Sequence, residues 1–183
     1  MKLWTLQSKE VMQIIDDEGI YRPDFKKSRF PSSSRDLYYE VLESFNRINE
    51  TQLNGVVFCF GQYCAPNTMT ELNSKEVFDR MIANSGIKEM LSYGYYNLFD
   101  GTHSLLRVEG FDSVNPIIVN FADFCDLISP QFFLSPDQAQ LVHDSIRHGI
   151  VVRPIIQCGS FFQYHIPFLK KERIVERYDN YSV

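Results

Sequence analysis

Four polar side chains lie within apolar segments near the two ends of the chain, where they could orient a ligand. Thr5 and Gln7 occur in the first segment, Lys2-Leu3-Trp4-Thr5-Leu6-Gln7. Gln163 and His165 occur in the late segment, Phe162-Gln163-Tyr164-His165-Ile166-Pro167. Ligand pockets combine rings and aliphatic groups with a few hydrogen-bonding groups. Both segments have that composition, so we expect two strands with a ligand cleft between them.

Gln163 and His165 are the candidate catalytic residues of this cleft. If the late segment is a strand, the two side chains point to the same face, because alternate residues of a strand do so. An imidazole in this position could polarise or protonate a ligand. The alternative interpretation is a histidine that is hydrogen-bonded at the edge of the core. The sequence leaves both interpretations open.

Five residues near the N-terminus are the candidate cofactor-binding residues: Trp4, Thr5, Gln7, Tyr21 and Arg22. Thr5 and Gln7 would orient the ligand through hydrogen bonds, and the ring of Tyr21 would stack on it. Arg22 would contact a phosphate, since a guanidinium pairs with phosphate through two parallel hydrogen bonds. For Trp4 and Tyr21, packing in the hydrophobic core is the alternative.

Short sequence signals predict the elements that must position these residues. Ser8 is a suitable N-cap for a helix that ends at Gly19. Ser135-Pro136-Asp137-Gln138 predicts the start of a helix that runs to His148. Asn73 and Glu76 resemble a capping box, and the apolar spacing from Leu37 to Phe45 is helical.

The predicted strands occupy the remaining apolar runs. The run from Gly55 to Gly61 is typical of a central strand that is buried on both faces. Further strands are predicted at 104–109, 117–121, 150–157 and 160–166, and residues 169–177 favour a last strand or a short helix. This order predicts an α+β fold with one mixed or antiparallel sheet and flanking helices, in a single domain spanning residues 1–183.

Composition narrows the possible functions. A hydrophobic content of 44% and a charged content of 22% indicate a globular chain with a proper core. The net charge of −5 gives no long-range attraction to nucleic acid. We find no segment that could span a bilayer and no signal peptide, so we expect a cytoplasmic protein without a membrane partner. The four cysteines and four histidines lack zinc-ligand spacing, so no metal site is predicted.

The two end segments resemble an uncharacterised family of bacterial and phage proteins that begins with a Leu-Trp-Thr-aliphatic-Gln strand. Residues 3–7, Gly19 and Tyr21 match its opening. Its closing segment is matched by Gln163, His165, Pro167, Lys170, Lys171, Glu172, Ile174 and Val175.

The same segments are more distantly similar to the ADP-ribosyltransferase fold. That resemblance implies a split sheet and an NAD cleft between the early and late strands. In that fold an early Arg or His holds NAD and a late glutamate acts in catalysis. Here Leu3 and Trp4 stand at the early position, and Tyr164 or His165 stands at the late one.

The leading hypothesis is therefore an ADP-ribosyltransferase-like domain that binds NAD or a nucleotide, with a protein or nucleic acid as acceptor. The first alternative is a non-catalytic interaction protein of phage or mobile-element origin that binds and inhibits a host protein; the aromatic surplus suits such an interface. The second is a small metal-dependent nuclease or nucleotide hydrolase that uses carboxylates such as Asp100, Glu109, Asp112 and Asp123. The acceptor and the oligomeric state do not follow from the sequence.

Overall fold

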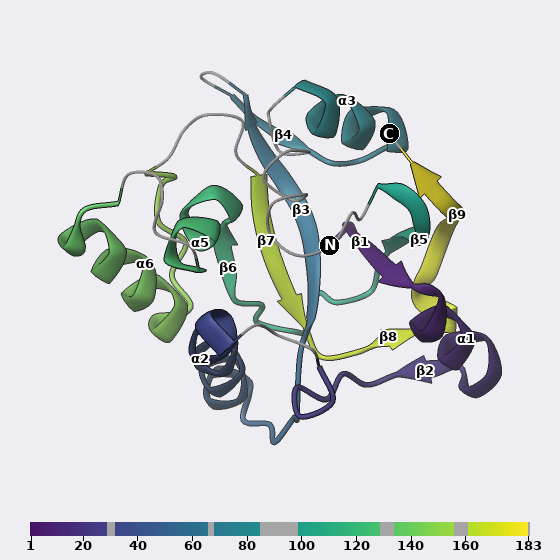
Figure 1. The fold of residues 1–183 in the computed structure, drawn as a ribbon, viewed down its shortest axis with the longest axis horizontal. Coiled ribbons are helices and arrows are strands. Elements are labelled where there is room, and N and C mark those ends of the chain that lie inside the picture. The colour runs from purple at the N-terminus through teal and green to yellow at the C-terminus, as the bar shows by residue number, and fades with distance from the viewer. Residues whose placement is uncertain (29–31, 66–67, 85–98, 129–133, 156–160, 183) are drawn as a thin grey trace.

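A computed structural model of the chain describes residues 1–28, 32–65, 68–84, 99–128, 134–155 and 161–182. In these residues seven strands form one antiparallel sheet, in the order β6-β7-β3-β1-β5-β9, with β4 paired to the remaining part of β3 (Figure 1). The α+β class with one antiparallel sheet and flanking helices is confirmed.

The elements follow one another along the chain with helices between the strands. The strands of the large sheet are β1 (Leu3–Ser8), β3 (Val57–Ala65), β4 (Thr68–Glu71), β5 (Asp100–Val108), β6 (Ile118–Asn120), β7 (Phe161–Ile166) and β9 (Ile174–Ser182). The helices are α1 (Lys9–Glu18), α2 (Ser32–Asn49), α3 (Lys75–Asn84), α5 (Phe121–Ile128) and α6 (Pro136–His148). The short strands β2 (Ile20–Tyr21) and β8 (Leu169–Lys170) form a separate two-stranded sheet, and a 3-10 turn (Lys171–Arg173) leads into β9.

The two faces of the large sheet are covered by different helices. On one face Trp4 and Phe60 pack against Phe78 and Met81 of α3. On the other face Leu3 packs against Met12 and Ile15 of α1, together with residues of β7 and β8. Helices α2, α5 and α6 gather at the β6 end of the sheet around a third cluster. Residues that alternate along one strand therefore face two separate parts of the core.

Local capping explains where two of the helices begin and end, as predicted. The Ser8 hydroxyl accepts a hydrogen bond from the Val11 backbone N–H, and Gly19 ends α1 in the left-handed region with φ of 76°. Ser135 and Gln138 form a complete capping box at the start of α6, and Gly149 ends that helix with φ of 64°. These predictions of helix ends are confirmed. Each cap depends only on a few neighbouring residues, which the sequence shows directly.

Three other boundary predictions are wrong. Helix α3 is capped by the Ser74 hydroxyl, which accepts a hydrogen bond from the Val77 N–H, and not by the side chain of Asn73. The predicted strand at 117–121 ends at Asn120, whose side-chain oxygen accepts the Asp123 N–H and so starts α5.

Residues 150–155 form no strand in the part of the chain described here. Pro154 has no N–H to donate to a ladder, and the N–H of Ile155 donates to Asp123 instead.

Candidate functional site

The first and late strands lie in one sheet, but β3 separates them. Strand β1 pairs with β3 at Trp4 and Phe60, and β7 pairs with the other edge of β3 from Phe161 to Ile166. The long β3 ribbon runs between them in Figure 1. A cleft formed directly between β1 and β7, as the sequence predicts, is therefore filled by β3 along most of its length.

Gln163 and His165 are buried, and they bond to each other. His165 is completely buried, and its Nδ1 lies 2.8 Å from the carbonyl oxygen of Ile117. Because a carbonyl only accepts, Nδ1 carries the proton, and Nε2 accepts the hydrogen bond from Gln163 Nε2 at 2.9 Å. Burial lowers the pKa of His165 from 6.5 to about 4, so the ring is neutral at pH 7. This geometry supports the interpretation of a hydrogen-bonded core histidine.

Thr5 and Gln7 lie on the opposite face of the sheet from Gln163 and His165. The hydroxyl of buried Thr5 donates to the Phe58 carbonyl oxygen at 2.7 Å, and Gln7 Nε2 donates to that hydroxyl at 2.6 Å. Leu3, which has the same orientation as Thr5, packs beneath α1, whereas Phe161, which has the same orientation as Gln163, packs on the α3 side. The structure does not bring these two polar pairs together.

The three remaining candidate cofactor-binding residues are also dispersed. Trp4 is completely buried, and its ring N–H donates to the Leu72 carbonyl oxygen at 2.6 Å. Tyr21 is half-buried on β2 opposite Leu169. The pKa of its hydroxyl is raised mainly by burial and to a smaller extent by the negative charge of Asp24. Arg22 follows β2 and is exposed. For Trp4 the structure favours core packing, and Phe60 separates it from Gln163, since both residues pair with Phe60.

A pocket does lie between the first strand and β7, at a different place from the predicted one. Strand β1 and strand β4 both use the same edge of β3, one after the other: Trp4 pairs with Phe60, and Glu71 pairs with Gln62. Between the start of β1 and the end of β4 the sheet opens into a pocket of about 280 Å³. We call it the split pocket; it is lined by Met1, Lys2, Leu3, Gly61, Gln62, Glu71, Leu72, Asn73 and Tyr164.

Gly61 forms the floor of the split pocket, where the pairing of β3 with β7 is interrupted. The register shifts between Phe60 and Gln62, which makes Gly61 the site of a β-bulge. A Cβ atom at this position would lie 2.6 Å from Cε2 of Tyr164 and 2.8 Å from Cδ2 of Leu3. The absence of a side chain at Gly61 therefore makes room for the side chains of Leu3 and Tyr164 over β3.

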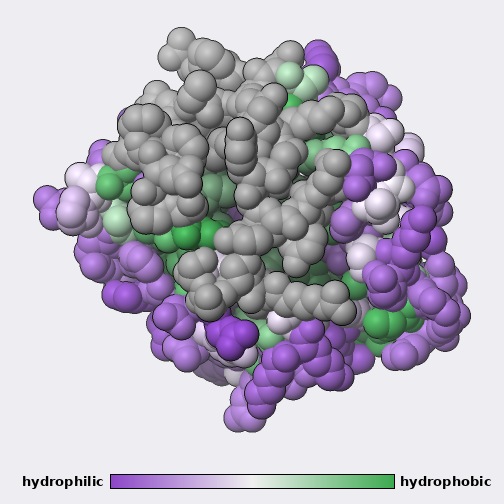
Figure 2. All heavy atoms as spheres, viewed as in Figure 1, coloured by the Kyte–Doolittle hydropathy of each residue, from purple (hydrophilic) through white to green (hydrophobic). Residues whose placement is uncertain are grey.

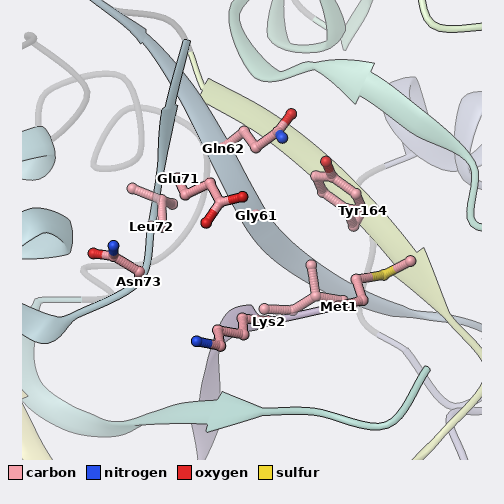
Figure 3. A pocket seen from close by; sticks show the side chains of 9 residues that line it. Met1, Lys2, Gly61, Gln62, Glu71, Leu72, Asn73 and Tyr164 are labelled. Atoms are coloured by element: carbon pink, nitrogen blue, oxygen red, sulfur yellow. The ribbon is translucent and has the colours of Figure 1, made fainter. Parts of the chain in front are cut away.

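The lining of the split pocket combines apolar groups with charged and amide groups (Figure 3). Lys2 and Glu71 contribute opposite charges, and Gln62 and Asn73 contribute amides that both donate and accept. The pKa of Tyr164 is raised, by burial first and by the negative charge of Glu71 second, so its hydroxyl keeps its proton at neutral pH. The pocket can therefore offer a ring, several hydrogen bonds and one cation to a ligand.

A second pocket, between α1 and the strands β5 and β9, is dominated by charge. It encloses about 440 Å³ and is lined by Lys9, Met12, Gln13, Asp16, Asp17, Ser104, Arg177, Asp179 and Asn180. Arg177 Nη1 donates to both carboxylate oxygens of Asp16 at 2.9 Å, and Arg177 Nε donates to Asp179 at 2.7 Å. The right-hand side of Figure 2, where α1 and β9 lie in Figure 1, is mostly hydrophilic. The principal cation of this pocket is already bonded within the chain.

The carboxylates considered for a metal-dependent nuclease are not clustered. Asp100 lies at the start of β5, Asp112 pairs with the N-terminal ammonium, and Asp123 is buried in α5. Within the described ranges no group of three or more His, Cys, Asp or Glu side chains could hold a metal ion.

Among the helices of the described residues, none has the length and apolar character that a membrane span requires.

Three polar residues that line the split pocket are not among the candidates predicted from the sequence: Gln62, Glu71 and Asn73. Gln62 and Glu71 belong to the β3–β4 hairpin, and Asn73 lies between β4 and α3. A signal was present, since a glycine inside a strand often marks a bulge or a close approach of another chain segment. Gly61 within an apolar run, followed at once by Gln62, fits that signal.

The comparisons with known proteins give no further guide to this site. No family model matches the chain, and no curated protein or solved structure matches it either.

Proposed function

We propose that this chain binds a nucleotide, NAD or a related one, in the split pocket. The observation that carries the proposal is the meeting of Leu3, at the start of the first strand, with Tyr164 of β7 over Gly61. The distant similarity to ADP-ribosyltransferases implies an NAD cleft between early and late strands. The split pocket lies between such strands, although its lining residues differ from those expected.

The chemistry of the lining suits a nucleotide. The side chain of Met1, with the edge of the Tyr164 ring that remains accessible, offers an apolar surface for a base, and the completely buried Leu3 supports them from below. The amide of Gln62 can both donate to and accept from the edge of a base or a carboxamide. The Lys2 ammonium can bind a phosphate. About 280 Å³ is near the lower limit of ligand pockets, which suits one nucleoside unit better than a whole dinucleotide.

The proposal is confined to binding, because the candidate catalytic residues do not line this pocket. Gln163 is 3% exposed and His165 is 0% exposed, and each is bonded within the chain. Transfer of ADP-ribose would need other groups. Such activity would appear as an added ADP-ribose mass on an acceptor.

A thermal-shift series with NAD, ADP-ribose and AMP tests the proposal. We expect a raised melting temperature in the wild-type protein without added metal, because ligand binding to the folded state stabilises it. The Gln62→Ala variant should lose most of this shift. Gln52→Ala, which removes an exposed amide elsewhere, is the matched control and should keep it. No shift with any of the three ligands would overturn the proposal.

Intact-mass analysis separates a binding domain from a transferase. The protein is incubated with NAD and pools of protein, DNA and RNA acceptors. An ADP-ribose adduct that depends on the split pocket would establish transfer. Binding without any adduct would support a domain that only binds its nucleotide.

A non-catalytic interaction protein is the second candidate, and one observation favours it. Ile150 and Val151, which directly follow α6, are 59% and 49% exposed. Adjacent exposed aliphatic residues are common where another protein binds. Capture of one defined host protein, lost in the Val151→Asp variant and unaffected by NAD, would establish this candidate in place of the nucleotide site.

A further inference from the structure

We infer that Glu71 holds the ribose hydroxyls of the bound ligand, so that the split pocket selects ribonucleotides and rejects ligands with a 2′-phosphate. This inference rests on the proposed function and names the ligand class of the same site. It depends on the position of the Glu71 carboxylate relative to the Lys2 ammonium, since the N-terminal ammonium of Met1 is already paired with Asp112.

Glu71 lines the split pocket and is exposed to solvent. Figure 3 shows it projecting from the end of β4 toward Gly61 and Tyr164, whereas the Asn73 amide projects the other way. The raised pKa of the Tyr164 hydroxyl, caused in part by the charge of Glu71, agrees with this proximity. A ligand that lies in the split pocket between Lys2 and Tyr164 would place some of its groups near this carboxylate.

A carboxylate only accepts hydrogen bonds, which limits what can face it. In a nucleotide the available donors are the ribose hydroxyls and any exocyclic amine of the base. The two oxygens of a carboxylate can accept from the two adjacent hydroxyls of a ribose, and acidic residues bind ribose hydroxyls in this way in dinucleotide-binding folds. Hydrogen bonds to a charged acceptor are roughly twice as strong as neutral ones.

The charge balance of the lining places the phosphate away from Glu71. Among the described lining residues Lys2 and Glu71 carry the charged side chains, and the N-terminal ammonium of Met1, which also lines the pocket, is paired with Asp112. A phosphate therefore belongs beside Lys2, where it is attracted, and the neutral sugar lies beside Glu71. A ligand with a second phosphate on its 2′ oxygen, as in NADP, would bring like charges together at Glu71.

Isothermal titration calorimetry with matched ligand pairs tests this inference. The probes are AMP, 2′-deoxy-AMP and IMP, followed by NAD and NADP. We expect 2′-deoxy-AMP to bind about tenfold more weakly than AMP, because one charge-assisted hydrogen bond is lost. IMP, which has a carbonyl oxygen in place of the exocyclic amine and a proton on N1, should bind about as AMP does, because the Gln62 amide can turn either its oxygen or its nitrogen to the base. NADP should bind at least tenfold more weakly than NAD.

The Glu71→Gln variant should reduce both preferences, because it removes the charge and keeps the shape. Glu43→Gln, at an exposed carboxylate on α2, is the control and should keep both. Equal binding of AMP and 2′-deoxy-AMP, or a loss specific to IMP, would overturn the role of Glu71 and leave the nucleotide site standing. No binding of any probe would overturn the site itself and this inference with it.

Discussion

Gly61 and Tyr164 lie so close together across the β3–β7 pair that a Cβ atom at position 61 would stand 2.6 Å from Tyr164 Cε2. That distance is shorter than any ordinary carbon–carbon contact. The bulge at Gly61, the ring of Tyr164 and the floor of the split pocket therefore depend on one another. The first prediction follows from this contact.

Gly61→Ala should destabilise the protein by about 1–3 kcal/mol, because the added methyl group overpacks the floor of the pocket. Urea unfolding at pH 7 measures the change. The double variant Gly61→Ala/Tyr164→Leu makes room for the methyl group and should be less destabilised than the sum of the two single variants. Strict additivity of the two changes would show that the contact with Tyr164 is not the source of the strain.

The buried His165 should make stability depend on pH below neutrality. Its pKa lies near 4 in the folded protein and near 6.5 when exposed, so the unfolded state binds the proton first as the pH falls. Stability is therefore lost between pH 6.5 and pH 4, by about 3 kcal/mol in total from this residue.

Urea unfolding at several pH values compares the wild type with His165→Asn, whose amide nitrogen can still donate to the Ile117 carbonyl. The variant should show a weaker dependence in this range. Identical slopes in both proteins would mean that His165 is not the titrating group.

The hydrogen bond from the Trp4 ring to the Leu72 carbonyl oxygen joins β1 to the end of β4 beside the split pocket. Trp4→Phe removes the N–H donor and leaves the buried Leu72 carbonyl oxygen without this hydrogen bond. The free energy of unfolding should fall by about 1–3 kcal/mol for this reason, in addition to the effect of lost packing. Circular dichroism during thermal unfolding measures the effect, since Trp4 is the single tryptophan and its fluorescence is lost in the variant. A melting temperature equal to that of the wild type would contradict this account.

The ion pairs around Arg177 should contribute little to stability despite their good geometry. The side chains of Arg177 and Asp16 are 34% and 42% exposed, so water and salt screen their attraction. Arg177→Lys loses the two-pronged contact and should cost about 0.5–1 kcal/mol at low salt, and less in 0.5 M salt. Arg153→Lys, at another exposed arginine, is the control for the substitution itself. A loss that does not change with salt would contradict an electrostatic origin.

The elements that the sequence predicts well are those defined by neighbouring residues. Ser8 and Gly19 bound α1, and Ser135 and Gly149 bound α6, because a cap depends only on the adjacent helical turn. The apolar run before Gly61 indicates a central strand, and β3 occupies the middle of the sheet.

The candidate site was harder to predict because it depends on strand order. The pattern of Gln163 and His165 shows that both side chains share a face, but it does not show that β3 lies beside them or that the face is covered. Thr5 and Gln7 have the same alternation and lie on the opposite face. The split pocket arises because β1 and β4 share one edge of β3, a relation between distant segments that periodicity does not contain.

The most direct test of the central claim is a methyl-resolved NMR titration of the wild-type protein with AMP and NAD. The methyl groups of Leu3 and Leu72 lie in the lining of the split pocket, whereas those of Leu141 and Val151 are exposed on and after α6. We predict saturable shifts at Leu3 and Leu72, with Leu141 and Val151 unchanged. Shifts confined to other methyl groups, or no shifts at all, would contradict a nucleotide site in the split of the sheet.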